Sequence, residues 1–159
     1  MMIVKLEIID TIKPIFKAYL DYISQFYEIE HHNAWCNGAL KNLQKYSVEP
    51  DHHMYALIKS ESIIGFAMVN KHFRFNTDGF AIAEFYIQKE HEKKGYGRTL
   101  AEHVFEQHKG PWEVAVSSKN NLAHKFWIQV LSSYTNDTFQ EKKASSFNGP
   151  CFIFSTRPN

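Results

Sequence analysis

Apolar positions along the chain alternate or recur in patterns that divide it into strands and helices. Short runs rich in β-branched and aromatic residues predict strands over residues 3–9, 53–59, 62–69 and 112–116. Apolar residues at helical spacing predict helices over residues 13–26, 39–46 and 97–108, and a last helix that begins at Asn120 or Asn121. The polar and aromatic stretch 28–38 is expected to be a loop. The tail 138–157 alternates enough for one or two strands, with a turn at 148–150.

The run Phe80–Ile87 carries a single charge, Glu84, and is expected to be a central strand buried on both faces. Strands and helices follow one another in mixed order, with no linker, repeat or low-complexity segment between them. This order predicts an α/β fold in which a mixed central β-sheet carries helices on both faces. We expect residues 1–159 to form a single domain.

Composition narrows the classes of protein to consider. The net charge of +1 lacks the basic excess of nucleic-acid binders, so no nucleic-acid partner is expected. No apolar run is long enough to cross a membrane and no secretory signal is visible, so we expect a cytoplasmic protein with no membrane partner. Cys36 and Cys151 suggest no disulfide framework. The aromatic content of 15% indicates a well-filled core, an aromatic-lined cleft, or both.

A glycine-bearing loop, Glu92–Thr99, lies between the expected central strand and the next helix. Such a turn exposes backbone N–H groups at the positive end of the helix dipole, which is an arrangement that binds phosphate. Gly95 and Gly97 allow close approach and dihedral angles that other residues disfavour. A dinucleotide fingerprint requires a third glycine where Leu100 stands, and the Gly-Lys-Ser/Thr ending of a Walker loop is missing.

A third pattern fits better. The strand 85–88 with the loop 91–98, followed by Asn120-Asn121-Leu122-Ala123-His124-Lys125-Phe126-Trp127, resembles the two signatures of the GNAT N-acetyltransferase superfamily. The resemblance extends from about Ser62 to Leu131 and is less distinct toward both ends. It implies a GNAT-like acyl-CoA N-acyltransferase fold and direct transfer of an acetyl group from acetyl-CoA to a primary amine within a ternary complex, without a metal.

The resemblance also implies roles for individual residues. The central strand diverges from the strand 112–116 in relatives, so that the pantetheine arm lies in the gap and a backbone N–H near Ile87 faces the thioester oxygen. The residues expected to bind the cofactor come from this strand, the loop and the following signature: Tyr86, Ile87, Lys93, Lys94, Gly95, Tyr96, Gly97, Arg98, Thr99 and Asn120. Asn120 is equally well explained as a helix cap, and the two roles are compatible.

Glu84 is the candidate catalytic base, acting directly or through water. It is the single charge of the central strand and shares a face with Tyr86. Burial would raise its pKa toward a useful range. The competing interpretation is a carboxylate that points to solvent or pairs with a lysine.

Two residues depart from the family pattern. Glu92 stands where Arg or Gln is usual and would repel a pyrophosphate, although Lys93, Lys94 and Arg98 are near enough in sequence to offset it. Trp127 stands where many members place the Tyr that protonates the departing thiolate. The thiolate would then leave unprotonated, or water, Tyr86 or Tyr134 would supply the proton.

The acceptor amine and the oligomeric state stay open, a homodimer included. In relatives the segment after the first helix lines the acceptor pocket, so Glu28, Glu30 and neighbouring histidines are candidates to receive an amine, with Tyr27 and Trp35 as walls. The adjacent pairs His31-His32 and His52-His53 rarely converge on one ion, and no metal is expected. Two other functions remain: an acyl-CoA-binding sensor module without turnover, favoured by Glu92 and Trp127, and a nucleotide-binding protein of another class.

Overall fold

The computed structural model describes residues 1–143 and 148–158. Within these residues seven strands form one sheet in the order β1-β2-β3-β4-β5-β7-β6. The strands are β1 (Met2–Leu6), β2 (His53–Lys59), β3 (Ser62–Asn70), β4 (Phe80–Ile87), β5 (Pro111–Ala115), β6 (Gln140–Lys143) and β7 (Pro150–Ser155). β4 and β5 are parallel and every other described pair is antiparallel, which makes the sheet mixed.

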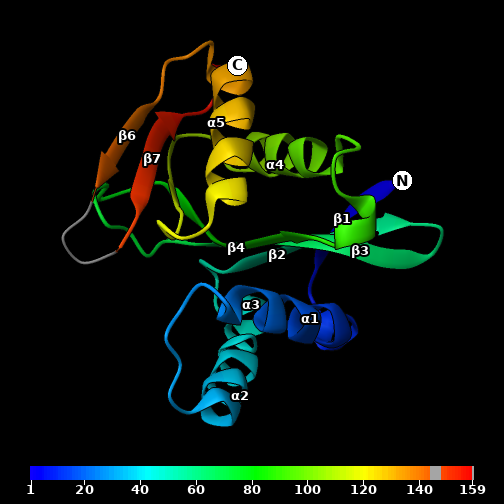
Figure 1. Cartoon of the computed structure of the whole chain (residues 1–159). Coiled ribbons are helices and arrows are strands. Elements are labelled where there is room, and N and C mark those ends of the chain that lie inside the picture. Colours follow the sequence, from blue (N-terminus) through cyan, green and yellow to red (C-terminus); the bar gives the residue numbers. More distant parts are fainter. Residues whose placement is uncertain (144–147, 159) are drawn as a thin grey trace.

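Helices cover both faces of this sheet, as the sequence predicts. One face carries α1 (Lys13–Ser24), α2 (His32–Asn42) and α3 (Lys45–Val48), and the opposite face carries α4 (Tyr96–Gln107) and α5 (Asn121–Thr135) (Figure 1). Short 3-10 turns, η1 (Asp10–Ile12) and η2 (Lys89–His91), precede α1 and the glycine loop. The described part of the chain contains no helix of the length and apolarity that crossing a membrane requires.

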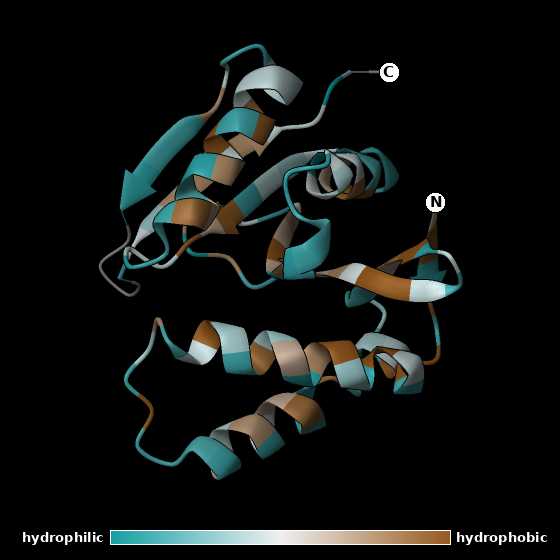
Figure 2. Cartoon of the chain, turned by 45° about the vertical axis from the view of Figure 1, so that its right-hand side comes forward, coloured by the Kyte–Doolittle hydropathy of each residue, from teal (hydrophilic) through white to brown (hydrophobic). Residues whose placement is uncertain are grey.

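Alternation along the strands creates a separate hydrophobic core on each face. In β2, Met54 and Ala56 are buried beneath α1 and α3, whereas Tyr55 and Leu57 are buried beneath α4 and α5. Neighbouring strand residues point to opposite faces, so a strand in the middle of the sheet serves both cores. The edge strand β6, by contrast, is fully exposed and hydrophilic along its length (Figure 2). Its Lys142 and Lys143 are exposed.

β4 and β5 separate soon after they meet. Their parallel pairing joins residues 80–82 to residues 112–114 and ends there. On the other side of β4 a bulge shifts the register with β3: Met68 faces Glu84, but Val69 faces Ile82, so that Ala83 is skipped. The second half of β4 therefore has an edge that none of the described strands covers, which is the divergence that the family resemblance implies.

Three local expectations are wrong. Residues 32–38 belong to α2 rather than to a loop, because Trp35, Ala39 and Leu40 pack against the core beneath α1 and override the polar composition. The strand expected to run to residue 9 ends at Leu6. β4 is buried at Ala81 alone and is partly exposed elsewhere, since its free half borders a cavity. The tail forms β6 and β7, and the expectation for residues 144–147 lies outside the described residues.

Candidate active site

A cavity of about 1120 Å³ opens where β4 and β5 diverge. Its walls come from the glycine loop, β4, β5 and α5 on one side and from α1, α2 and α3 on the other. It brings together most of the residues expected to act: Glu84, Tyr86, Ile87, Lys93, Gly95, Gly97, Arg98 and Asn120. One continuous space thus connects the expected phosphate loop with the expected base.

The glycine loop has the backbone conformation of an anion site. Gly95 has φ +85° and immediately precedes α4, and Lys93 is also left-handed at φ +60°. The N–H and hydroxyl of Thr99 both donate to the Gly95 carbonyl, at 3.1 and 3.0 Å, and thereby fix the first turn. The first N–H groups of a helix have no acceptor within it, so those of residues 96–98 are available to a ligand.

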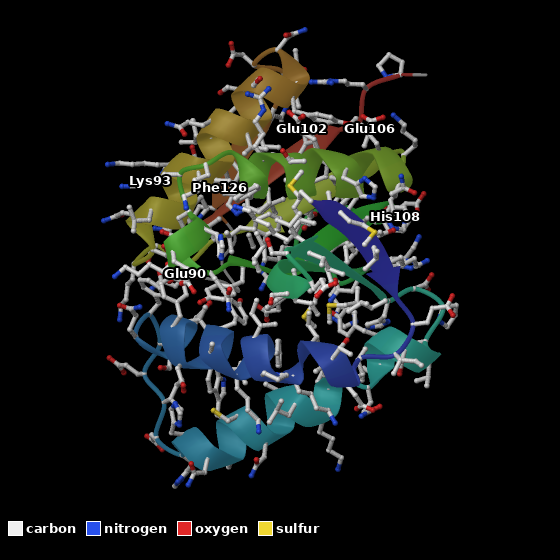
Figure 3. The ribbon with its side chains drawn as sticks, turned by 90° about the vertical axis from the view of Figure 1, so that its right-hand side faces the viewer. Glu90, Lys93, Glu102, Glu106, His108 and Phe126 are labelled. Carbon is white, nitrogen blue, oxygen red and sulfur yellow. The ribbon has the colours of Figure 1, made fainter. Side chains whose placement is uncertain are left out.

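Gly97 serves packing more than ligand approach. A Cβ at this position would lie 2.9 Å from the ring of Phe126 and 3.5 Å from Ile87. Its missing side chain therefore lets α4 pack closely against α5. Gly95, in contrast, has open space around its Cβ position and is required by its dihedral angles. Phe126 and Lys93 both lie at the loop end of the molecule, far from His108 at the other end of α4 (Figure 3).

The charges of the loop are only partly directed at the cavity. Lys93 and Glu92 line it. Arg98 also borders it, but its guanidinium pairs with Glu102 at 3.0 Å and donates to Ser133 Oγ at 2.6 Å. Lys94 donates to the Glu90 carbonyl at 3.0 Å, outside the cavity lining. The expected offset of Glu92 by three cations is therefore weaker than the sequence suggests.

Two other residues expected to bind the cofactor also lie outside the lining. Tyr96 is partly buried beneath the ammonium of Lys59, which lies 5.1 Å from its ring centroid. The Thr99 hydroxyl is occupied by the Gly95 carbonyl. Both side chains contact the loop or its neighbours outside the cavity lining and stabilise the loop from that side.

Glu84 lies on the floor of the cavity, on the face of β4 that α1 covers. The Tyr19 hydroxyl of α1 donates a hydrogen bond to its Oε2. Burial raises the pKa of Glu84 to about 7, although the bond from Tyr19 acts in the opposite direction. Burial and the negative charge of Glu84 raise the pKa of Tyr19 well above its ordinary value, so this hydroxyl stays protonated as a donor. A carboxylate that titrates near neutrality in a cavity has the properties of a general base.

Comparison with known proteins identifies the family. The model of the Acetyltransferase (GNAT) family matches residues 16–130. The chain belongs to the GNAT acetyltransferase family. A search of curated protein sequences gave no match.

Solved structures share the whole GNAT fold at low identity. The PaiA N-acetyltransferase of Thermoplasma acidophilum, solved with coenzyme A, is 13% identical over 98% of this chain and 99% of its own, with a TM-score of 0.67. An acetyltransferase from Thermus thermophilus is 14% identical over 98% and 97%, with a TM-score of 0.70. A spermidine N-acetyltransferase from Vibrio cholerae, solved with CoA and spermine, is 12% identical over 97% and 95%, with a TM-score of 0.63. At these identities the likeness shows the fold alone.

Trp127, which departs from the GNAT pattern, and Tyr134 both lie in the core. Trp127 is buried and packs against Phe85 and Phe105, so it belongs to the core as well as to the cavity wall. Tyr134 is also buried, donates to Glu106 at 2.5 Å and does not line the cavity. The suggestion that Tyr134 protonates a departing thiolate is therefore wrong. Asn120 caps α5 by accepting from the Ala123 N–H at 3.1 Å, and it borders the cavity too.

Aromatic rings build the half of the GNAT cavity that faces α1. Tyr86 lies 5.4 Å from Tyr19 and 5.9 Å from Tyr22, and Tyr22 lies 5.4 Å from Phe26 between ring centroids. Tyr27 and Trp35 line this half as expected, whereas Glu28, Glu30, His31 and His32 do not. The sequence pattern places Tyr19 in the core and does not single out Tyr22. Their helical spacing is the same as that of core residues, so the sequence carries no separate signal for either ring.

Glu113 of β5 organises the rim of the cavity and was not singled out from the sequence. It is 3% exposed and accepts the backbone N–H groups of Arg74 and Phe75, each at 2.8 Å, and that of Asn76. The segment 71–79 is thereby held so that His72 and Arg74 border the cavity. A lone carboxylate in a buried strand was the sequence signal.

The described residues contain no group of three or more His, Cys, Asp or Glu side chains that could hold a metal ion. His32 and Cys36 lie close together, with Nδ1 and Sγ 3.7 Å apart on one face of α2, but they are not part of the cavity lining.

Proposed function

We propose that this protein is an N-acetyltransferase that moves an acetyl group from acetyl-CoA to a primary amine by direct attack in a ternary complex. The observation that carries the proposal is the position of Glu84, which shares one cavity with the glycine loop and the free edge of β4. Residues 1–159 would act as one catalytic domain. The spermidine N-acetyltransferase with the same fold, solved with CoA and spermine, supports an amine as acceptor.

The donor would bind to backbone groups of this chain. Residues 96–98 would present their N–H groups to the pyrophosphate, and Lys93 would supply a nearby positive charge. The uncovered half of β4 would pair with the amides of the pantetheine arm, as a strand pairs with a sheet edge. Gly95, Ile87 and Asn120 would complete this half of the site.

Glu84 would take a proton from the attacking amine. The amine nitrogen forms a bond to the thioester carbonyl carbon, the carbon–sulfur bond breaks, and the proton passes to the Glu84 carboxylate. A carboxyl group with a pKa of about 7 is largely ionised slightly above neutrality and ready to accept it. A protonated amine has a pKa of about 10.4, so it must first release one proton to expose its lone pair, and the proton that passes to Glu84 as the new bond forms is the second.

Departure of the thiolate requires little help. A thiol with a pKa of about 8.5 is only about 1.5 units above neutrality, worth about 2 kcal/mol. Burial, together with the charges of Glu90 and Glu92, raises the pKa of Tyr86, which makes it a poor proton donor. An unprotonated thiolate, or water as the donor, therefore fits this cavity better than a tyrosine acid.

Neither cysteine is placed to carry the acetyl group. Cys36 does not line the cavity. Cys151 is buried, and burial together with the neighbouring Glu113 carboxylate raises its pKa to about 12, so no nucleophilic thiolate forms there. These placements support direct attack over a cysteine-linked intermediate.

Calorimetry and a turnover assay test the proposal together. Acetyl-CoA should bind to the purified chain, and thiol should be released when primary amines are added. Binding of acetyl-CoA without release of thiol across a broad amine panel would instead favour the acyl-CoA-binding module. The presence of Glu92 in the loop favours that alternative. Stronger thermal stabilisation by ATP or NAD than by coenzyme A would point to the nucleotide-binding alternative.

A further inference from the structure

The half of the cavity that faces α1 offers rings and very little negative charge. Among the described residues that line the cavity, three carry a carboxylate: Glu84, Glu92 and Glu113. Glu92 belongs to the glycine loop, and Glu113 is occupied by three backbone N–H groups. Glu84 is thus the carboxylate that remains to receive an acceptor amine.

A positive charge stands at the rim of the same half. Arg74 borders the cavity, and its backbone is held there because the Glu113 carboxylate accepts the Arg74 backbone N–H. Burial and the charge of Glu84 raise the pKa of Tyr27, whereas Arg74 lowers it, so both charges act on this hydroxyl. A polyamine needs several carboxylates spaced along its length, and Glu84 is the one carboxylate among the described residues that is available in this half. The charge pattern therefore favours an acceptor with a single amine.

The walls around Glu84 are suited to a flat apolar group. Tyr22 and Phe26 contact each other edge to face, with centroids 5.4 Å apart, and Tyr22 lies beside Tyr86. Tyr27 and Trp35 line the outer part, and Tyr27 is 46% exposed although it is a large ring. Aromatic pairs prefer such tilted and edge-to-face arrangements, and a further ring inserted among them would gain contacts of the same kind.

We propose that the acceptor is a small primary monoamine carried on a short chain from an aromatic ring. This inference rests on the proposed acetyltransferase function and names the substrate class of the same site. The ring would lie among Tyr22, Phe26, Tyr27 and Trp35, and the amine would reach the carboxylate of Glu84. The amine arrives as a cation, which both the faces of these rings and the carboxylate attract; it gives up one proton before its lone pair can attack and a second as the new bond forms.

A matched panel of amines tests this inference with the full chain and acetyl-CoA. The probes are phenethylamine, tryptamine, hexylamine, spermidine and the dipeptide alanyl-glycine, each assayed for thiol release and for the mass of the acetylated product. We expect kcat/KM for phenethylamine or tryptamine to exceed that for hexylamine and for spermidine by about tenfold or more, because only the arylalkylamines fill the aromatic walls.

Substitution of Tyr27 by alanine and by phenylalanine provides the matched test of the walls. Tyr27 is exposed, so Tyr27→Ala should leave the fold intact. Tyr27→Ala should lower the preference for phenethylamine over hexylamine by about fivefold, while Tyr27→Phe, which keeps the ring, should retain it. An unchanged preference in Tyr27→Ala would overturn the inference.

The outcomes separate the inference from the proposed function. Turnover of hexylamine, spermidine or the dipeptide as good as that of the arylalkylamines would overturn the aromatic acceptor and leave the acetyltransferase standing. Thiol release with none of the amines, while coenzyme A still binds, would overturn both.

Discussion

The two halves of the cavity differ in the groups that they offer to a ligand. The half beneath α4 and α5 relies on backbone: the left-handed Gly95, the first turn of α4 and the free edge of β4. The half beneath α1 and α2 relies on side chains, with Glu84 bonded to Tyr19 and aromatic rings around it. Backbone groups are the same in every residue, so the first half tolerates a departure such as Glu92. The second half depends on each side chain.

The largest effect should come from the side-chain half. Glu84→Gln keeps the shape of the residue and an oxygen that accepts from Tyr19, but it cannot take a proton from the amine. Loss of a general base typically costs 10²–10⁴-fold, so we expect kcat to fall by about 10²-fold or more. Steady-state kinetics of thiol release measures the loss, and calorimetry with coenzyme A should show an unchanged Kd. A kcat within threefold or so of the native value would exclude Glu84 as the base.

The same substitution should stabilise the fold. The ordinary pKa of 4.5 applies to Glu84 in the unfolded chain and about 7 in the folded one, so the folded state holds an extra proton between these values. The free energy of unfolding of the native protein therefore falls as pH rises from 4.5 to 7. The Glu84→Gln variant has no ionisable group at this position, so its stability does not fall for this reason. Above pH 7 we expect Glu84→Gln to unfold with a free energy higher by on the order of 3 kcal/mol.

Denaturant titrations at several pH values measure this difference. The advantage of Glu84→Gln should vanish below pH 4.5, where Glu84 is protonated in both the folded and the unfolded native protein. An advantage that is the same at about pH 4 and about pH 8 would mean that it does not arise from ionisation of Glu84.

In the backbone half, Gly95→Val should weaken coenzyme A binding by about tenfold or more. A β-branched side chain at φ +85° is strained, and the loop must move to relieve it. Lys94→Ala is the control, because Lys94 lies outside the cavity lining. Calorimetry on both variants decides the matter: equal Kd values for Gly95→Val and the native protein would show that the loop conformation is not needed.

Tyr19→Phe should shift the pH dependence of kcat/KM rather than abolish activity. The Tyr19 hydroxyl favours the ionised form of Glu84, so its removal raises the pKa of Glu84. The ascending limb of kcat/KM should shift by about one unit to higher pH. Tyr22→Phe is the control: it removes a hydroxyl from the same helix, and this hydroxyl makes no hydrogen bond with Glu84. The ascending limb of its kcat/KM profile should therefore lie at the same pH as that of the native protein. Identical shifts in the two variants would argue against the Tyr19–Glu84 bond as the cause.

The smallest effect belongs to Glu92. Glu92→Arg replaces a repulsive charge in the loop and should tighten coenzyme A binding by about threefold to tenfold at low salt. The gain should shrink as salt is added, because the residue is exposed. Calorimetry at two salt concentrations measures it, and an unchanged or weaker affinity at low salt would refute a role for this charge.

The contrast between the halves also explains what the sequence could predict. The glycine loop and the strand before it could be predicted because a left-handed turn favours glycine and a central strand of a sheet is rich in apolar residues. Glu84 could be predicted as a candidate site residue because it is the single charge in such a strand. Tyr19 and Tyr22 were not distinguishable from core residues, since the helical spacing that buries a ring is the same as that which aims it into a cavity.

Long-range contacts account for the remaining errors. α2 exists because Trp35 and its neighbours bury against α1, which no local pattern shows. The bond from the Phe75 N–H to Glu113 joins residues 38 positions apart in the chain. The capacity of Arg98 to offset Glu92 was overestimated because the i,i+4 pair with Glu102 was not considered and Ser133, 35 positions away, could be found only in three dimensions.

A crystal structure of the complex with coenzyme A tests the central claim most directly. The pyrophosphate should accept hydrogen bonds from the backbone N–H groups of residues 96–98, and the sulfur should lie between β4 and β5 on the side of Glu84. A pyrophosphate bound elsewhere, or a sulfur separated from Glu84 by the wall of the cavity, would contradict the account.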